Sequence, residues 1–112
     1  MSYTLLVWGS PVPDSAREAG ELIKRPSDTT FDATPALVAF VRELLDEFPT
    51  IAADPKRSPW SVMPTPSERF VELDFSSRAK DADIERVVAL ARRHGLVVYD
   101  PEGPALYPPP EG

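Results

Sequence analysis

The chain contains no cysteine, which excludes disulfide bonds and thiolate chemistry. It has a single histidine and no carboxylate spacing of the calcium-loop kind, whereas a metal centre needs several such ligands together. None of its five glycines belongs to a GxGxxG or Walker pattern, and no nucleophile elbow occurs. We therefore expect no metal, no cofactor and no catalytic residue, and we expect that the protein is not an enzyme.

No stretch of the sequence approaches the roughly 20 apolar residues that cross a bilayer, and the first residues lack the basic start of a secretory signal. Lys and Arg number 12 against 18 Asp and Glu, so the net charge is -6. The basic residues form separate pairs at 24–25, 56–57 and 92–93 rather than one cluster. The lack of a spanning segment and of a signal pattern predicts a cytoplasmic protein. Because the acidic balance repels phosphate backbones and anionic lipids, we expect no binding to nucleic acid or to a membrane.

What is present is enough apolar sequence for one hydrophobic core. The chain has 112 residues, of which 42% are hydrophobic, and this suits a single folded domain. We place that domain, an α/β sandwich, at residues 1–101. Residues 102–112 are rich in proline and are predicted to form a C-terminal tail.

The first half of the chain predicts one strand and two helices. The apolar run 3–8 predicts a central strand. Ser15 and Glu18 form a capping-box pattern, which predicts a helix that ends before Pro26. Thr34 followed by proline begins the clearest helical pattern, which ends at Pro49, and 27–33 is predicted as a loop.

The second half predicts an edge strand, a half-buried strand, a helix and a last strand. Prolines flank the short run 60–63, so it belongs at a sheet edge. Residues 70–75 alternate, with Glu72 and Asp74 on the face opposite Val71, Leu73 and Phe75. A helix capped by Asp81 or Asp83 precedes Gly95, and residues 96–99 form the final strand.

This element order predicts an α+β protein with the ferredoxin-like, split βαβ arrangement, an antiparallel sheet and an extra helix in the first crossover. The first and third strands are expected at the centre of the sheet, with the second and fourth at its edges. Trp8, Trp60 and the stretch 75–77 are then expected to meet at one end of the sheet, with both tryptophans in one neighbourhood.

The Ser58-Pro59-Trp60 segment is the most distinctive candidate for binding, because a tryptophan on a proline-stiffened loop suits an interface anchor. Its rival interpretation is a tryptophan that closes the end of a small core. The candidate binding residues are Trp8, Ser58, Trp60, Phe75 and Ser77. Glu72 and Asp74 are explained more simply as a strand face in water than as acid-base groups, and His94 as a residue favoured by the helix dipole.

The motifs Val7-Trp8, Ser58-Pro59-Trp60 and His94 to Pro101 resemble those of a group of small, stand-alone and mostly uncharacterised bacterial proteins. The resemblance spans roughly residues 3–101 and transfers no catalytic residue. Small acidic bacterial proteins of this kind resemble immunity proteins, which neutralise a toxin in the cell that makes it.

Two functions of different class remain open, with a minor enzyme as a third reading. The leading hypothesis is a non-catalytic binding protein, such as an immunity or regulatory protein, that neutralises a basic toxin or effector protein through an acidic face with an aromatic anchor. The alternative is a regulatory domain that binds a small molecule in a pocket lined by Trp8, Trp60 and Phe75. Exposed sheet edges leave both a monomer and a homodimer open.

Overall fold

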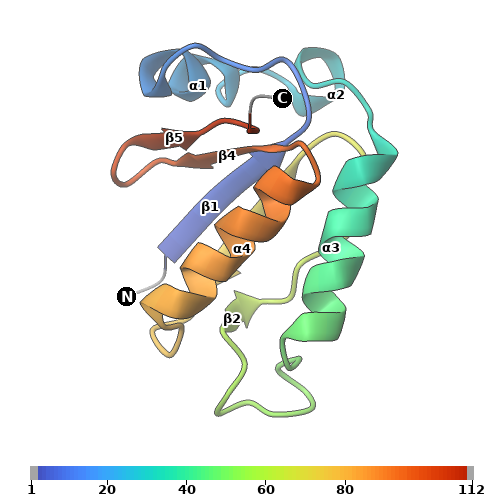
Figure 1. The fold of residues 1–112 in the computed structure, drawn as a ribbon, viewed down its shortest axis with the longest axis vertical. Helices are drawn as coiled ribbons and strands as arrows, with labels where there is room; N and C mark the ends of the chain where they lie inside the picture. Colours follow the sequence, from blue (N-terminus) through green and yellow to red (C-terminus); the bar gives the residue numbers. More distant parts are fainter. Residues whose placement is uncertain (1–2, 111–112) are drawn as a thin grey trace.

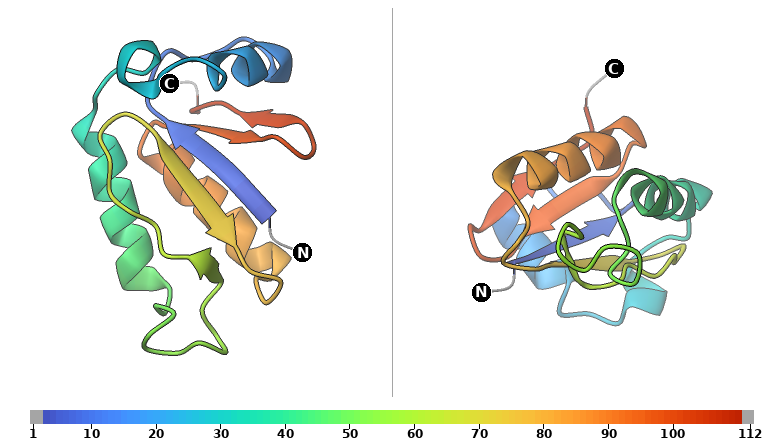
Figure 2. Two further views of the ribbon diagram at one scale, coloured as in Figure 1. Left: turned by 180° about the vertical axis from the view of Figure 1, so that it is seen from behind. Right: turned by 90° about the horizontal axis from the view of Figure 1, so that it is seen from below.

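The computed structural model describes residues 3–110 and shows an α+β protein in three layers. An antiparallel sheet forms the middle layer, α3 and α4 cover one face, and α1 and α2 lie on the other (Figures 1 and 2). In chain order the elements are β1 (Tyr3–Trp8), α1 (Ala16–Leu22), α2 (Ser27–Thr30), α3 (Pro35–Glu47), β2 (Trp60–Val62), β3 (Val71–Phe75), α4 (Asp81–Arg93), β4 (Val97–Asp100) and β5 (Ala105–Tyr107).

The sheet has the strand order β2-β3-β1-β4-β5, and every neighbouring pair is antiparallel. The predictions of β1 as a central strand, of β3 beside it and of β2 at an edge are confirmed. The predicted edge position of β4 is wrong, because residues 105–107 pair with it and form the outer strand. Part of the predicted tail therefore belongs to the sheet, while residues 111–112 of that tail lie outside the described residues.

Local capping signals account for most helix boundaries. The Ser15 side chain accepts from the Glu18 amide at the start of α1, and Thr34 accepts from the Ala36 amide at the start of α3, both as predicted. The predicted cap of α4 is wrong: Lys80 is the N-cap residue, and Asp83 accepts from its amide at 3.0 Å. The loop predicted between the first two helices contains the short helix α2, while Gly95 has the positive φ of 76° expected of a helix-ending glycine.

Each face of the sheet supports its own hydrophobic core. Alternate residues of β1 and β3, including Leu5, Val7 and Leu73, pack against α3 and α4. The other residues of β1, Leu6 and Trp8, pack with α1 and with Phe31. The second core covers only part of its face, because α1 and α2 lie at one end of it (Figure 2, left).

The two tryptophans do not share a neighbourhood, and this prediction is wrong. Because β1 and β3 are antiparallel, Phe75 lies opposite Tyr3 at the start of β1, while Trp8 ends that strand. Trp60 pairs with Phe75 and belongs to the core under α3 and α4, whereas Trp8 belongs to the core on the other face. Strand direction and side-chain alternation together separate the two rings.

Candidate functional site

The predicted aromatic residues form core contacts rather than a pocket. Trp8, Trp60 and Phe75 are each 0% exposed. The Trp60 ring lies 5.1 Å from that of Phe75, while the Trp8 ring lies 4.9 Å from that of Phe31. The interpretation of Trp60 as a core residue is therefore favoured over an exposed anchor, and the small-molecule pocket expected between these three rings is wrong.

The two predicted serines have different surroundings. Ser58 is fully buried, where its amide donates to the Asp54 carbonyl at 2.9 Å and its hydroxyl accepts from the Trp60 amide at 3.4 Å. It thus shapes the loop that leads into β2. Ser77 is exposed, at a surface depression of about 370 Å³ that it shares with Tyr3, Asp81 and Glu85.

The start of β1 carries a partly buried polar contact that the sequence did not predict. The Tyr3 hydroxyl donates to Oδ2 of Asp100, whose side chain is almost fully buried. Oδ1 of Asp100 accepts from the amides of Glu102 and Gly103, at 2.9 and 3.2 Å. The carboxylate therefore joins β1 to the turn between β4 and β5, a structural role that the Asp-Pro sequence at 100–101 signals only as a turn.

Ionisation of the Tyr3 phenol is expected to lower the stability of the protein at alkaline pH. Burial first, and then the hydrogen bond to Asp100, raise the pKa of its phenol above the ordinary value of 10.0. A raised pKa in the folded state stabilises the protein below the pKa of the unfolded chain, and this contribution is lost as pH rises through the folded value. Above about pH 10, the wild type is therefore expected to lose stability more steeply than Tyr3→Phe. Urea denaturation of both proteins across that range tests this, and parallel pH profiles would contradict it.

The helices α1 and α2 leave part of the second sheet face uncovered (Figure 2, left). Glu72 and Asp74 place a pair of carboxylates at alternate positions of β3, on the side of the strand opposite Leu73. The Thr4 hydroxyl of β1 donates to Oδ1 of Asp74 at 2.9 Å. A hydrogen bond with Asp74, then partial burial and the charge of Asp74, raise the pKa of Glu72. Neither carboxylate forms an ion pair with any residue of 3–110. We call Thr4, Val62, Glu72 and Asp74 the open sheet face.

Val62 gives the open sheet face an apolar margin. It lies opposite Asp74 in the β2–β3 pairing, at a register shift, and its side chain is 60% exposed. A register shift of this kind changes the face on which a strand side chain lies. The spacing of Glu72 and Asp74 identified the acidic part of this face from the sequence, whereas Val62 depended on the register shift and had no sequence signal.

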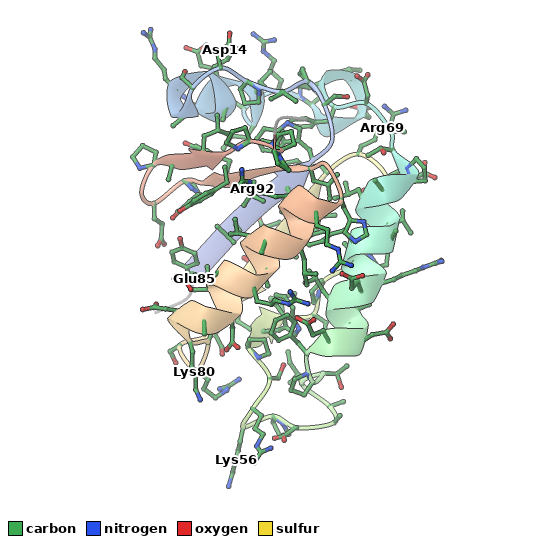
Figure 3. The ribbon with its side chains drawn as sticks, viewed as in Figure 1. Asp14, Lys56, Arg69, Lys80, Glu85 and Arg92 are labelled. Atoms are coloured by element: carbon green, nitrogen blue, oxygen red, sulfur yellow. The ribbon has the colours of Figure 1, made fainter. Side chains whose placement is uncertain are left out.

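A second charged surface gathers basic residues from two loops. Lys56, Arg57, Arg78 and Lys80 line one depression of about 420 Å³ together with Asp83. Lys56 and Lys80 lie at the same end of the molecule in Figure 3. The expectation that the basic residues stay in separate pairs is therefore wrong for 56–57. The antiparallel β2–β3 pairing brings the segment before β2 beside the segment after β3. Pairing these two predicted strands would have indicated from the sequence that the basic residues of the two segments meet.

His94 connects the end of α4 to α3. Its Nε2 lies 3.7 Å from a carboxylate oxygen of Glu43, and its ring lies 6.0 Å from that of Phe40. These contacts place it in the packing between the two helices. Among the residues 3–110, no group of three or more His, Asp and Glu side chains is arranged to hold a metal ion.

In the same part of the chain, no helix has both the length and the apolar character that a membrane span requires. No protein-family model, curated protein or solved structure matches the chain. The two charged surfaces are therefore the features of the molecule that indicate a function.

Proposed function

We propose that the protein is a non-catalytic binding protein that holds a basic segment of a partner protein on its open sheet face. The observation that carries the proposal is the Glu72–Asp74 pair. These two carboxylates lie close together, and neither forms an ion pair with a Lys, Arg or His among the described residues. The hydrogen bond with Asp74 first, then partial burial and the repulsion between the two carboxylates, raise the pKa of Glu72. A Lys or Arg from a partner relieves the repulsion, so the face is complementary to a cation.

The composition supports the same class of partner. A net charge of -6 steers a basic protein toward this chain over several ångströms of solvent. The exposed Val62 side chain beside Asp74 offers apolar contact next to the charges. We propose a basic toxin or effector protein as the partner and the cytoplasm as the compartment, in keeping with the resemblance to immunity proteins. The aromatic anchor expected for this interface is replaced by Val62, since Trp60 is buried.

The proposal about the fold is that β1, α3, β2, β3, α4 and β4 form the split βαβ unit of ferredoxin-like proteins. It is supported by the position of β1 between β3 and β4, antiparallel to both, and by the packing of α3 and α4 on one face. In this reading α1, α2 and β5 are additions. They cover one end of the second face and leave the open sheet face free.

The double change Glu72→Gln with Asp74→Asn tests the function. We expect it to weaken binding to a basic decapeptide of lysine by about tenfold or more, because both attracting charges are lost. NMR titration of labelled protein measures the affinity, and the amides of 4, 72 and 74 are expected to shift in the wild type. Binding is also expected to weaken as pH falls through the raised pKa of Glu72.

The matched control is Asp46→Asn with Glu85→Gln, which removes two exposed carboxylates from α3 and α4. It is expected to change affinity less than about twofold at physiological salt, where distant surface charges are screened. Affinity purification from native cells with both variants then extends the test to the natural partner. The proposal would be contradicted if the peptide shifted amide signals of α3 and α4 instead. It would also be contradicted if the double variant of β3 and the control variant retained a natural partner equally.

A further inference from the structure

The basic depression concentrates positive charge on an acidic protein. Four of the 12 Lys and Arg residues of the chain line it, and Asp83 is the single carboxylate among its lining residues. The cations come in two pairs, Lys56 with Arg57 before β2 and Arg78 with Lys80 after β3. Such a concentration is opposite in sign to the net charge, so it is a local feature of the fold rather than of composition.

The backbone beneath the cations is held in place by hydrogen bonds. The amide of Ser76 donates to the Pro59 carbonyl at 2.8 Å, which ties the two loops together. The amide of Arg78 donates to the Ser76 hydroxyl at 3.2 Å. Buried Ser58 anchors the first loop, and the Lys80 amide is held by Asp83. The positions from which the four side chains project are therefore defined before any ligand arrives.

Carboxylates of the chain leave most of this charge unneutralised. Arg57 has one long contact, 3.9 Å from Nε to Oδ2 of Asp54. Lys56, Arg78 and Lys80 form no ion pair with any residue of the described range 3–110. By contrast, Arg86 on α4 forms a two-pronged bond to Glu47, with nitrogen-to-oxygen distances of 2.8 and 2.9 Å. The basic depression thus retains donors that an external anion can use.

We propose that this depression binds a small molecule bearing phosphate groups. Two guanidinium groups supply paired donors that match phosphate oxygens, and two ammonium groups add point charges. The volume of about 420 Å³ is within the range of small-molecule sites. An extended nucleic acid is disfavoured, because the acidic remainder of the surface repels a long phosphate backbone. The site shares no residue with the open sheet face and does not depend on the proposed function.

Titration with inorganic pyrophosphate tests the site. Wild-type protein, followed by NMR at physiological salt, is expected to bind it with amide shifts in the segments 56–59 and 76–80. Arg57→Gln with Arg78→Gln is expected to weaken binding at least tenfold. The control Lys24→Gln with Arg25→Gln removes two exposed cations elsewhere and is expected to change affinity less than twofold. Urea denaturation of each variant verifies that the fold is intact.

Three further ligands distinguish a soluble phosphorylated compound from a lipid headgroup and from a nucleic acid as the source of the phosphate. Soluble inositol hexakisphosphate is expected to bind more tightly than pyrophosphate, because it presents more phosphate groups to the four cations. Vesicles containing phosphatidylinositol bisphosphate and a single-stranded oligonucleotide of ten nucleotides are expected to bind more weakly than the soluble compound. A preference for the vesicle or the oligonucleotide would overturn the proposal. So would the absence of pyrophosphate binding up to about 10 mM, or an equal loss in the control variant.

Discussion

Trp60→Ala is expected to lower the free energy of unfolding by about 3–5 kcal/mol, the range for removing a buried tryptophan from a packed core. Trp60 is 0% exposed, and its ring contacts those of Phe75 and Phe48, with centroids 5.1 and 5.9 Å away. Alanine leaves a cavity beneath β2 that the surrounding side chains fill only partly. Since small domains are stable by about 5–15 kcal/mol, this loss is a large fraction of the total. Urea denaturation followed by circular dichroism measures it.

Two further variants at β2 make this prediction specific. Val62→Ala lies two residues away, is 60% exposed in the wild type, and is expected to change stability by less than about 0.5 kcal/mol. Trp60→Phe is expected to cost less than about 2 kcal/mol, because it also removes the buried indole N–H, which has no hydrogen-bond partner among the described residues. Equal stability of Trp60→Ala and Val62→Ala would contradict the core position of Trp60.

The expected loss of stability makes Trp60→Ala unsuitable as a test of binding. Because Trp60→Ala destabilises the whole domain, loss of a partner in that variant would report partial unfolding rather than loss of an anchor. Changes on the open sheet face avoid this problem. Removing one of two repelling carboxylates, as in Glu72→Gln, leaves stability unchanged or slightly higher, so a loss of binding then has a local cause.

Asp100→Ala is expected to destabilise the protein by about 2–4 kcal/mol. The change leaves the Tyr3 hydroxyl and the amides of Glu102 and Gly103 without their acceptor. It also loosens the turn that presents β5 to β4, so hydrogen exchange is expected to rise first at residues 105–107. Urea denaturation and amide exchange together measure the two effects.

Tyr3→Phe is the comparison variant for Asp100→Ala, since it removes one of the three hydrogen bonds and keeps the ring packed near Phe75. Its expected cost is about 0.5–1.5 kcal/mol. If Asp100→Ala costs no more than Tyr3→Phe, the carboxylate does not organise the turn. Faster exchange throughout the sheet, rather than at β5, would indicate a global loss of stability instead.

Local elements were predictable because their causes lie within a few residues of sequence. The Ser15 and Thr34 caps, the helix preceding Gly95, and the two faces of β3 all follow from near-neighbour spacing. The cap of α4 was missed because Lys80 offers no typical capping side chain and Asp83 acts from the third helical position. β5 was missed because its three residues lie between prolines, and the pairing with β4 is what makes them a strand.

The candidate surfaces were predictable only in part. The sequence predicted that Glu72 and Asp74 point outward from a strand. It did not predict that this part of the sheet is free of a covering helix, because that depends on where α1 and α2 pack. The sequence left two interpretations of Trp60 open, an exposed anchor and a core residue, because a proline-flanked tryptophan suits both positions and sequence contains no measure of exposure. The basic depression appears only when the two loops are paired.

By itself, the sequence determined the strand alternation, the main helices and the acidic balance, because periodicity and charge are properties of neighbouring residues and of composition. Tertiary structure alone decided that Trp8 and Trp60 enter different cores, that β5 extends the sheet, and that Lys56 and Lys80 share one depression. These outcomes depend on contacts between residues far apart in the chain. Strand direction, register and helix placement set such contacts, and these cannot be inferred from the residues of a single local segment.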